Sequence, residues 1–257
     1  MRNFYREYKN APDLPPLAGE IAWTKNLLML DRCADPLQRE FYLRATARFG
    51  WSRRVLEHQL DNQTYEKYLL NQTSFDNSLP PVAAAQAKLA VKDHYTFGFL
   101  ELSEAHEERE LETALLGQIR SFLSEMGPHF AFVGSQYRLT VEGNDYFIDL
   151  LLYHRALKCL IAVDLKIGEF EPEHKGKMEF YLVALNEQMK LPEENDAIGI
   201  IVCKSKKRTV VEYALKSSTL PIGVSTYGLT SHLPESYRNL LPSEAEIAAR
   251  LQGWEKK

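Results

Sequence analysis

The chain has 257 residues, of which 45% are hydrophobic and 26% charged, and its formal net charge is −4. This composition is ordinary for a globular protein of one large or two modest domains. No apolar run approaches the roughly 20 residues that span a bilayer, and the first residues have no apolar core of signal-peptide type. Three scattered cysteines indicate reduced thiols, and no pair of them has the spacing of a zinc knuckle. We therefore expect a cytoplasmic protein with no membrane partner.

The charge is unevenly distributed along the chain. Residues 1–92 hold 13 Lys and Arg against 10 Asp and Glu, whereas the remainder holds 18 against 25. A mildly basic front and an acidic back suit a DNA-binding module followed by a metal-dependent catalytic module. Chance variation of the surface charge explains the same asymmetry, so it decides nothing by itself.

The first part of the chain predicts three short helices. Asp35-Pro36 opens the second helix, and Gly50 ends it. Ser52 caps the third helix, which begins with Arg53 and Arg54. Two interpretations stay open: a helix-turn-helix or winged-helix unit in which both arginines contact DNA, or a plain three-helix bundle that exposes them to solvent.

The stretch from Asn71 to Pro81 is the clearest loop signal, and we place a domain boundary there. The sequence thus predicts a small helical, winged-helix-like DNA-binding domain at 1–80. A linker at 81–102 is expected to dock its aromatic residues on a neighbour. A second domain is expected at 103–257.

From residue 103 the predicted order of elements is α-β-β-β-α-β-α-β. Ser103 caps the first of these helices, and Gly127-Pro128 ends it. This order predicts an α/β fold with a mixed β-sheet flanked by helices. Strands are expected at 130–141, 146–153, 159–168, 196–203 and 221–225, and helices at 175–189, at 208–216 and in the tail from 233.

Two of these strands carry an acidic residue where a core strand normally holds an aliphatic one. The residues are Asp149 and Asp164, and Lys166 shares a face of its strand with Asp164. An ionised side chain in an apolar sheet is costly unless it is paired or binds a metal. The alternative is a buried salt bridge between the strands, but such pairs stabilise poorly compared with apolar residues. We therefore predict a divalent-metal site for phosphoryl chemistry.

Phosphodiester cleavage needs an activated water molecule, shielding of the phosphate oxygens and help for the leaving oxygen, all of which Mg²⁺ ions supply. Asp149 and Asp164, with the main-chain carbonyl of Leu165, provide the hard oxygen ligands that Mg²⁺ prefers. Lys166 would orient or deprotonate the water, or stabilise the transition state. Its role stays open because burial lowers the pKa of an amine whereas neighbouring carboxylates raise it.

At this point the residues match a known family. Asp149, Asp164 and Lys166 in a hairpin, followed by a helix with Tyr181, resemble the PD-(D/E)XK nuclease superfamily. The span from about residue 110 to 229 is similar to the C-terminal module of the YhcG-like bacterial proteins, and the front is similar to their helical domain. The segments that carry the resemblance are Phe-Val-Gly-Ser-Gln-Tyr137, Phe-Ile-Asp-Leu-Leu-Leu-Tyr-His154, Val-Asp-Leu-Lys-Ile-Gly168, Gly-Lys-Met-Glu-Phe-Tyr-Leu182 and Gly-Trp-Ser-Arg-Arg-Val-Leu-Glu57.

The resemblance implies a restriction-endonuclease-like fold and a Mg²⁺-dependent endodeoxyribonuclease, with Mn²⁺ as an alternative metal. It implies that Asp149, Asp164 and the Leu165 carbonyl bind the metal and that Lys166 is catalytic. Glu112, on the helix before the sheet, is expected to add a further acidic ligand, with Glu110 as its rival. DNA is the expected partner, and a homodimer is expected because superfamily members commonly act as dimers.

Three further residues are expected to support the site. Gln136 and Tyr181 have ordinary structural roles as their alternative. Lys177 stands where part of the superfamily carries a glutamine, and it would either reach a phosphate or displace the metal. The second outcome predicts a different function, namely a catalytically inactive nuclease-fold subunit that binds DNA or serves as a scaffold.

Overall fold

The computed structural model describes residues 18–61, 63–103, 105–127, 129–229 and 243–252. The chain divides into two compact units. The helical unit holds the described residues up to Leu70 together with residues 243–252, and the sheet unit holds residues 71–229 within the described ranges. No helix of these ranges is long and apolar enough to cross a bilayer.

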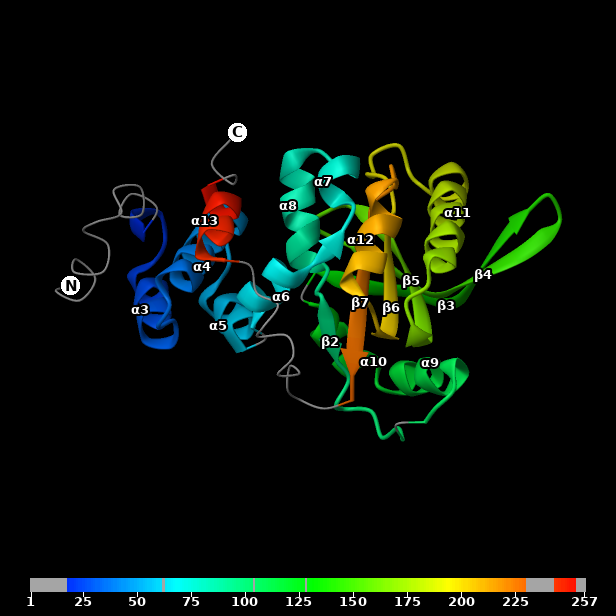
Figure 1. Cartoon of the computed structure of the whole chain (residues 1–257), viewed down its shortest axis with the longest axis horizontal. Helices are drawn as coiled ribbons and strands as arrows, with labels where there is room; N and C mark the ends of the chain where they lie inside the picture. Colours follow the sequence, from blue (N-terminus) through cyan, green and yellow to red (C-terminus); the bar gives the residue numbers. More distant parts are fainter. Residues whose placement is uncertain (1–17, 62, 104, 128, 230–242, 253–257) are drawn as a thin grey trace. The chain divides into compact units, whose positions relative to one another are not determined.

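The helical unit contains no strand among its described residues, so the predicted helical N-terminal region is confirmed and no wing accompanies it there. The C-terminal helix of the chain packs against the second helix of this unit, with Ile247 and Leu251 buried. The predicted helical tail thus belongs to this unit, and its first part, 233–242, lies outside the described residues. The helices are α3 (Trp23–Arg32), α4 (Pro36–Phe49), α5 (Arg53–Asp61), α6 (Thr64–Leu70) and α13 (Glu244–Gln252) (Figure 1).

Local signals set the ends of α4 and the start of α5 as predicted. The carboxylate of Asp35 accepts hydrogen bonds from the backbone N–H groups of Leu37 and Gln38, at 3.1 and 3.3 Å. Gly50 ends α4 with a φ of 62°, a left-handed conformation that glycine adopts without strain. Ser52 Oγ accepts from the backbone N–H of Val55 at 3.2 Å and caps α5.

From residue 103 onward the sheet unit has the predicted order of elements, except that the first predicted helix is two helices, α9 (Glu108–Gly117) and α10 (Ile119–Met126). The mixed sheet flanked by helices confirms the predicted fold class. The strand order is β1-β7-β6-β5-β4-β3, and β2 pairs with β7. The pairs β5–β6, β6–β7 and β2–β7 are parallel, whereas the pairs β3–β4, β4–β5 and β1–β7 are antiparallel. The strands are β1 (Gln72–Thr73), β2 (His94–Thr96), β3 (Phe130–Val141), β4 (Asn144–His154), β5 (Cys159–Glu169), β6 (Ile198–Ser205) and β7 (Ile222–Gly228).

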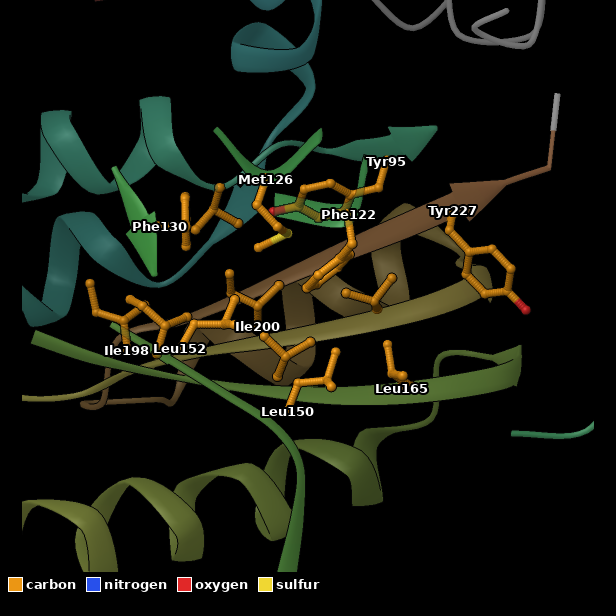
Figure 2. Close-up of a cluster of buried hydrophobic side chains, with 14 of the residues drawn as sticks. Tyr95, Phe122, Met126, Phe130, Leu150, Leu152, Leu165, Ile198, Ile200 and Tyr227 are labelled. Atoms are coloured by element: carbon orange, nitrogen blue, oxygen red, sulfur yellow. The ribbon is translucent and has the colours of Figure 1, made fainter. Parts of the chain in front are cut away.

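Each face of the sheet is covered by helices, because the central strands are apolar on both sides. Leu111 of α9 and Phe122 of α10 pack on one face, in a cluster that Figure 2 shows in part. Leu182 of α11 and Val211 of α12 pack on the other face. The helices are α7 (Phe75–Ser78), α8 (Pro81–Ala90), α9 (Glu108–Gly117), α10 (Ile119–Met126), α11 (Pro172–Gln188) and α12 (Arg208–Lys216).

The linker predicted at 81–102 is wrong, because this stretch forms α8 and β2 of the sheet unit. Tyr95 and Phe97 are fully buried in the cluster under α10, as aromatic residues docked on a neighbour would be. His94 of β2 pairs with Thr226, which lies 132 residues later, so no local pattern announces this strand. The boundary between the units falls after Leu70 rather than at 80.

The helix α9 begins later than predicted. The sequence predicts Ser103 as its cap, whereas the helix begins at Glu108 and Glu107 is the capping residue. The side chain of Glu110 accepts a hydrogen bond from the backbone N–H of Glu107 at 2.8 Å, which completes a capping box. Acidic side chains at these positions are also stabilised by the positive N-terminal end of the helix dipole. This start decides which acidic residues of α9 point toward the sheet.

His154, at the end of β4, gives the sheet unit a sensitivity to acid. It is buried, its Nδ1 accepts a hydrogen bond from the backbone N–H of Leu157 at 3.0 Å, and its ring lies 4.7 Å from that of Phe130. Burial lowers the pKa of His154 to about 4. Since this lies below the unfolded value of about 6.5, the stabilisation is complete above that pH and is lost as the pH falls toward 4.

We expect the free energy of unfolding to fall by as much as ~3 kcal/mol through His154 alone between about pH 7 and pH 4. Urea denaturation at a series of pH values measures this loss. The variant His154→Asn keeps an acceptor close to the position of Nδ1 for Leu157 but is not protonated in this range, so its stability should change less. An identical pH dependence for both proteins would contradict the assignment.

Candidate active site

The site begins where β4 and β5 separate. The last antiparallel pair of these strands on this side is Leu150 with Val163, after which β4 stays paired with β3 alone. The backbone N–H of Leu165 is thereby left without a partner on β4, and it donates instead to Asp149 Oδ2 at 2.8 Å. The side chain of Asp149 thus replaces a backbone hydrogen bond between the two strands and is held beside β5.

Asp164 lies on the face of β5 that α11 covers. Its neighbours Val163 and Leu165 point into the cluster under α9 and α10, so the alternation of the strand turns Asp164 the other way. The carboxylate is almost completely buried, with 1% of the residue exposed. A buried carboxylate requires cationic or hydrogen-bonding partners.

Lys166 is one of these partners. Its ammonium lies 2.8 Å from each of three oxygen atoms, namely Asp164 Oδ2, the carbonyl oxygen of Leu165 and Glu108 Oε1. The contact with Asp164 is an ion pair without the geometry of a hydrogen bond. Two strand residues and one helix residue therefore direct their oxygen atoms at one cation.

Lys177 of α11 is the second partner of Asp164. Its ammonium donates to Asp164 Oδ1 at 2.9 Å and lies 5.4 Å from the ring centre of Tyr181. The hydroxyl of Tyr181 donates to the backbone carbonyl of Phe147 at 2.6 Å, which ties α11 to β4 next to Asp149. The predicted supporting residues of α11 thus lie at the site.

Gln136 connects the sheet to α9 on the other side. Its φ of 43° is unusual for a residue with a side chain, and it lies just beyond an irregularity in the pairing of β3 with β4. Its side-chain nitrogen donates to Glu112 Oε2 at 2.8 Å and lies 3.4 Å from Asp149 Oδ1. The backbone thus adopts a strained conformation at the residue that links two of the acids.

An open pocket of about 460 Å³ lies between α9 and the sheet. It is lined by acids of the site and by one arginine of α9, so it presents oxygen atoms and a cation to solvent together. The lining residues are Glu108, Arg109, Glu112, Gln136, Asp149 and Leu165.

The electrostatics of the site follow from burial and from the close approach of the two aspartates. Burial, and then the charge of Asp164, raise the pKa of Asp149 to about 6. For Lys166, burial lowers the pKa, but Asp164 and Glu108 more than offset this and the net shift is upward. The pKa of Lys177 is also raised, because Asp164 outweighs the effect of burial. Both lysines are therefore ammonium cations at neutral pH.

The structure brings most of the sequence-predicted residues together, and it adds two. Asp149, Asp164, Leu165, Lys166, Lys177, Tyr181, Gln136 and Glu112 surround the site. Glu108 and Arg109 were not predicted; the spacing of four residues between Glu108 and Glu112 on one helix face is the signal that would have found Glu108. Glu110, the rival of Glu112, caps the helix instead.

Arg53 and Arg54 belong to the helical unit and lie in the first turn of α5. Both are exposed, and Arg53 Nε lies 3.0 Å from Glu57 Oε1, four residues later. An exposed pair of this kind contributes little to stability. These arginines are thus accessible to a partner, as both interpretations of the sequence expect.

The donor atoms fit a divalent cation, although the described residues hold no group of three His, Cys, Asp or Glu side chains arranged as a metal cluster. The oxygen atoms around Lys166 include the main-chain carbonyl of Leu165, which is a possible metal ligand although it is not a side chain. Carboxylate and carbonyl oxygens are the ligands of hard cations such as Mg²⁺. Three such oxygen atoms lie 2.8 Å from the ammonium of Lys166, which shows that this part of the site accommodates positive charge.

Comparison with known proteins identifies the family. A family model described as the YhcG PDDEXK nuclease domain matches residues 88–242, which is more than half of the chain. The chain belongs to the YhcG family of PDDEXK nuclease domains. A second model, the DUF1016 N-terminal domain, matches residues 1–67. The predicted resemblance to the YhcG-like proteins is confirmed.

The chain is 39% identical over 219 residues to "Putative nuclease YhcG" from Escherichia coli (strain K12). The aligned region covers 83% of this chain and 55% of that relative. The chain therefore spans about half the length of this curated member of the YhcG family.

Two solved structures are similar to part of the chain. One is a repair endonuclease from Pyrococcus abyssi, with a TM-score of 0.32 and 16% identity over 48% of each chain. The other is the structure of an EndoMS–dsDNA2 complex, with a TM-score of 0.35, 15% identity and coverage of 51% of this chain and 49% of that chain. The strand order and the match to the PDDEXK domain define the fold of the sheet unit.

Proposed function

We propose that the sheet unit hydrolyses phosphodiester bonds of DNA with the help of a divalent metal ion, Mg²⁺ in the first place and Mn²⁺ as the alternative. The observation that supports this best is the convergence of three oxygen atoms on one cation, Lys166 Nζ, in a PDDEXK nuclease domain. A divalent metal held beside these oxygen atoms and Asp149 would supply charge for the phosphate oxygens and a water molecule of lowered pKa.

The acidic residues and Lys166 would have different roles. Asp149, Asp164 and the carbonyl of Leu165 would hold the metal, and Glu108 or Glu112 would add an acidic oxygen from α9. Lys166 is kept protonated by its carboxylate neighbours, so it suits the stabilisation of negative charge on phosphate oxygens better than the abstraction of a proton.

The cations at the rim suit contacts with the sugar–phosphate backbone. Arg109 lines the open pocket, where the other charged lining residues, Glu108, Glu112 and Asp149, are acids. Arg53 and Arg54 of the helical unit would contribute further backbone contacts, which carry affinity but no sequence information. We also propose that the protein forms a homodimer. Analytical ultracentrifugation determines this oligomeric state.

The direct experiment incubates the purified protein with supercoiled plasmid and with branched DNA, in Mg²⁺, in Mn²⁺ and in EDTA. We expect nicked or linear products with either metal and none in EDTA. The variant Lys166→Met, which keeps most of the side-chain volume, serves as the inactive control. If neither DNA is cut in the presence of Mg²⁺ or of Mn²⁺, the proposal is wrong.

A second function is favoured by the contact of Lys177 with Asp164, because an ammonium on this carboxylate opposes a metal. In this case the protein is a nuclease-fold subunit that binds DNA or serves as a scaffold without cutting. The variant Lys177→Gln separates the two functions. Cleavage that arises only in the variant would favour the second function for the natural chain.

A further inference from the structure

Asp164 is neutralised twice, by cations from two different elements. Lys166 contacts Oδ2 from the same strand, and Lys177 contacts Oδ1 from α11, at 2.8 and 2.9 Å. Both carboxylate oxygens are therefore occupied by ammonium groups. A divalent metal that bound Asp164 would therefore lie close to at least one of these ammonium groups and would repel it.

The two lysines differ in how firmly they are held. Lys166 has 14% of its side chain exposed and three oxygen partners, whereas Lys177 has 44% exposed and one carboxylate partner. Within the described part of the chain, Tyr181 is the further neighbour of the Lys177 ammonium, which lies 5.4 Å from the centre of its ring. A half-exposed lysine regains water when it leaves, so Lys177 is the cation that costs less to displace.

We propose that Lys177 is a displaceable counter-cation of Asp164, which holds the carboxylate in the absence of metal, yields Oδ1 when a divalent metal binds, and then contacts a phosphate of the substrate. The inference rests on the proposed function, since it assumes a metal at Asp164. Two electrostatic effects favour the release. A bound metal would neutralise Asp164 in place of the lysine, and its positive charge would repel the nearby ammonium. The flexible stem of the lysine lets the released ammonium move to an incoming phosphate.

Calorimetric titration of the DNA-free protein with Mn²⁺ tests the first step. We expect Lys177→Met to bind the metal about threefold to fivefold more tightly than the wild-type protein, the size of a partly exposed ion pair. Lys177→Gln, which is also neutral but polar, should behave in the same way. The matched control is Lys175→Met on the same helix, whose ammonium contacts Glu179 and Ser217 at 3.3 and 3.2 Å and should not affect metal binding.

Thermal unfolding gives a second measurement. Without metal, Lys177→Met leaves Asp164 with Lys166 alone, so its midpoint should fall relative to the wild-type protein. Saturating Mn²⁺ should raise the midpoint more in the variant, because no internal cation competes. An equal rise in both proteins would contradict the displacement.

Binding of a short DNA duplex tests the second step. The salt dependence of binding, measured in Ca²⁺ and in EDTA, reports the number of phosphate contacts. In the wild-type protein the slope should become steeper by about one contact in Ca²⁺, and in Lys177→Met it should stay unchanged. A wild-type slope that is equal in Ca²⁺ and EDTA would overturn this step.

The outcomes separate this inference from the proposed function. A wild-type protein that neither binds metal nor cuts DNA refutes the function itself. A wild-type protein that does both, while Lys177→Met and Lys177→Gln bind Mn²⁺ no more tightly, refutes only the role of Lys177.

Discussion

Asp149→Asn is expected to reduce DNA cleavage by at least about a hundredfold while the protein stays folded. The asparagine keeps an oxygen atom that accepts the backbone N–H of Leu165, which Asp149 Oδ2 now binds at 2.8 Å. Only the negative charge is lost, and with it a ligand for the proposed metal. Cleavage of plasmid DNA under saturating Mg²⁺ and the midpoint of thermal unfolding measure the two effects separately.

Two further variants serve as comparisons for Asp149→Asn. Asp149→Ala removes the charge and the acceptor together, and a buried N–H without a partner costs about 1–3 kcal/mol, so this variant should lose stability as well. Asp145→Asn, on the exposed part of the same strand, should cut DNA as well as the wild-type protein does. Cleavage by Asp149→Asn above roughly a tenth of the wild-type rate would remove this residue from the catalytic machinery.

Lys206→Met is expected to destabilise the sheet unit by about 3–5 kcal/mol. Lys206 and Asp93 form an ion pair with only 3% and 1% of their side chains exposed, and Lys206 also donates to the carbonyl of Val224 at 2.7 Å. Burial raises the pKa of Asp93 and lowers that of Lys206, although each group favours the charge of the other, so each charge is costly to bury without its partner. Without the lysine, Asp93 keeps a buried charge with Arg208 as a more distant cation.

A double-mutant cycle tests this dependence. Combining Lys206→Met with Asp93→Asn removes both charges, so the double variant should be more stable than the sum of the single losses predicts, by about 2 kcal/mol or more. Lys207→Met, the next residue, is the exposed control: its ion pair with Glu169 has 71% of the lysine side chain exposed and is worth less than about 1 kcal/mol. Strictly additive losses in urea denaturation would mean that the pair is not coupled.

The parts of this protein that sequence predicted are those whose signals are local. Asp35, Pro36 and Gly50 mark the ends of α4 through contacts within a few residues, and the structure has those contacts. Asp149 and Asp164 stood out because each interrupts an apolar strand, and both lie at the site. In the first case the residues suit the end of a helix, and in the second a charged residue stands among apolar neighbours. Both signals are visible within a few residues of sequence.

The parts that sequence missed depend on contacts between distant residues. The strand β2 has three residues, and only its pairing with β7 across more than half of the chain makes it a strand. Residues 107, 108 and 110 are all glutamates, and the first turn of α9 decides that Glu108 reaches Lys166 whereas Glu110 caps the helix. Neither outcome is visible until the neighbouring element is in place.

The packing of α13 against α4 has a topological consequence. Because the chain leaves the helical unit after Leu70 and returns to it with Ile247 and Leu251, the sheet unit is inserted into the helical one and is connected to it by two covalent crossings. One proteolytic cut in either crossing would therefore leave the halves joined by the other. Deleting the last helix would expose apolar surface on α4, far away in sequence from the deletion, so a shortened chain is expected to lose its N-terminal helices before its nuclease sheet.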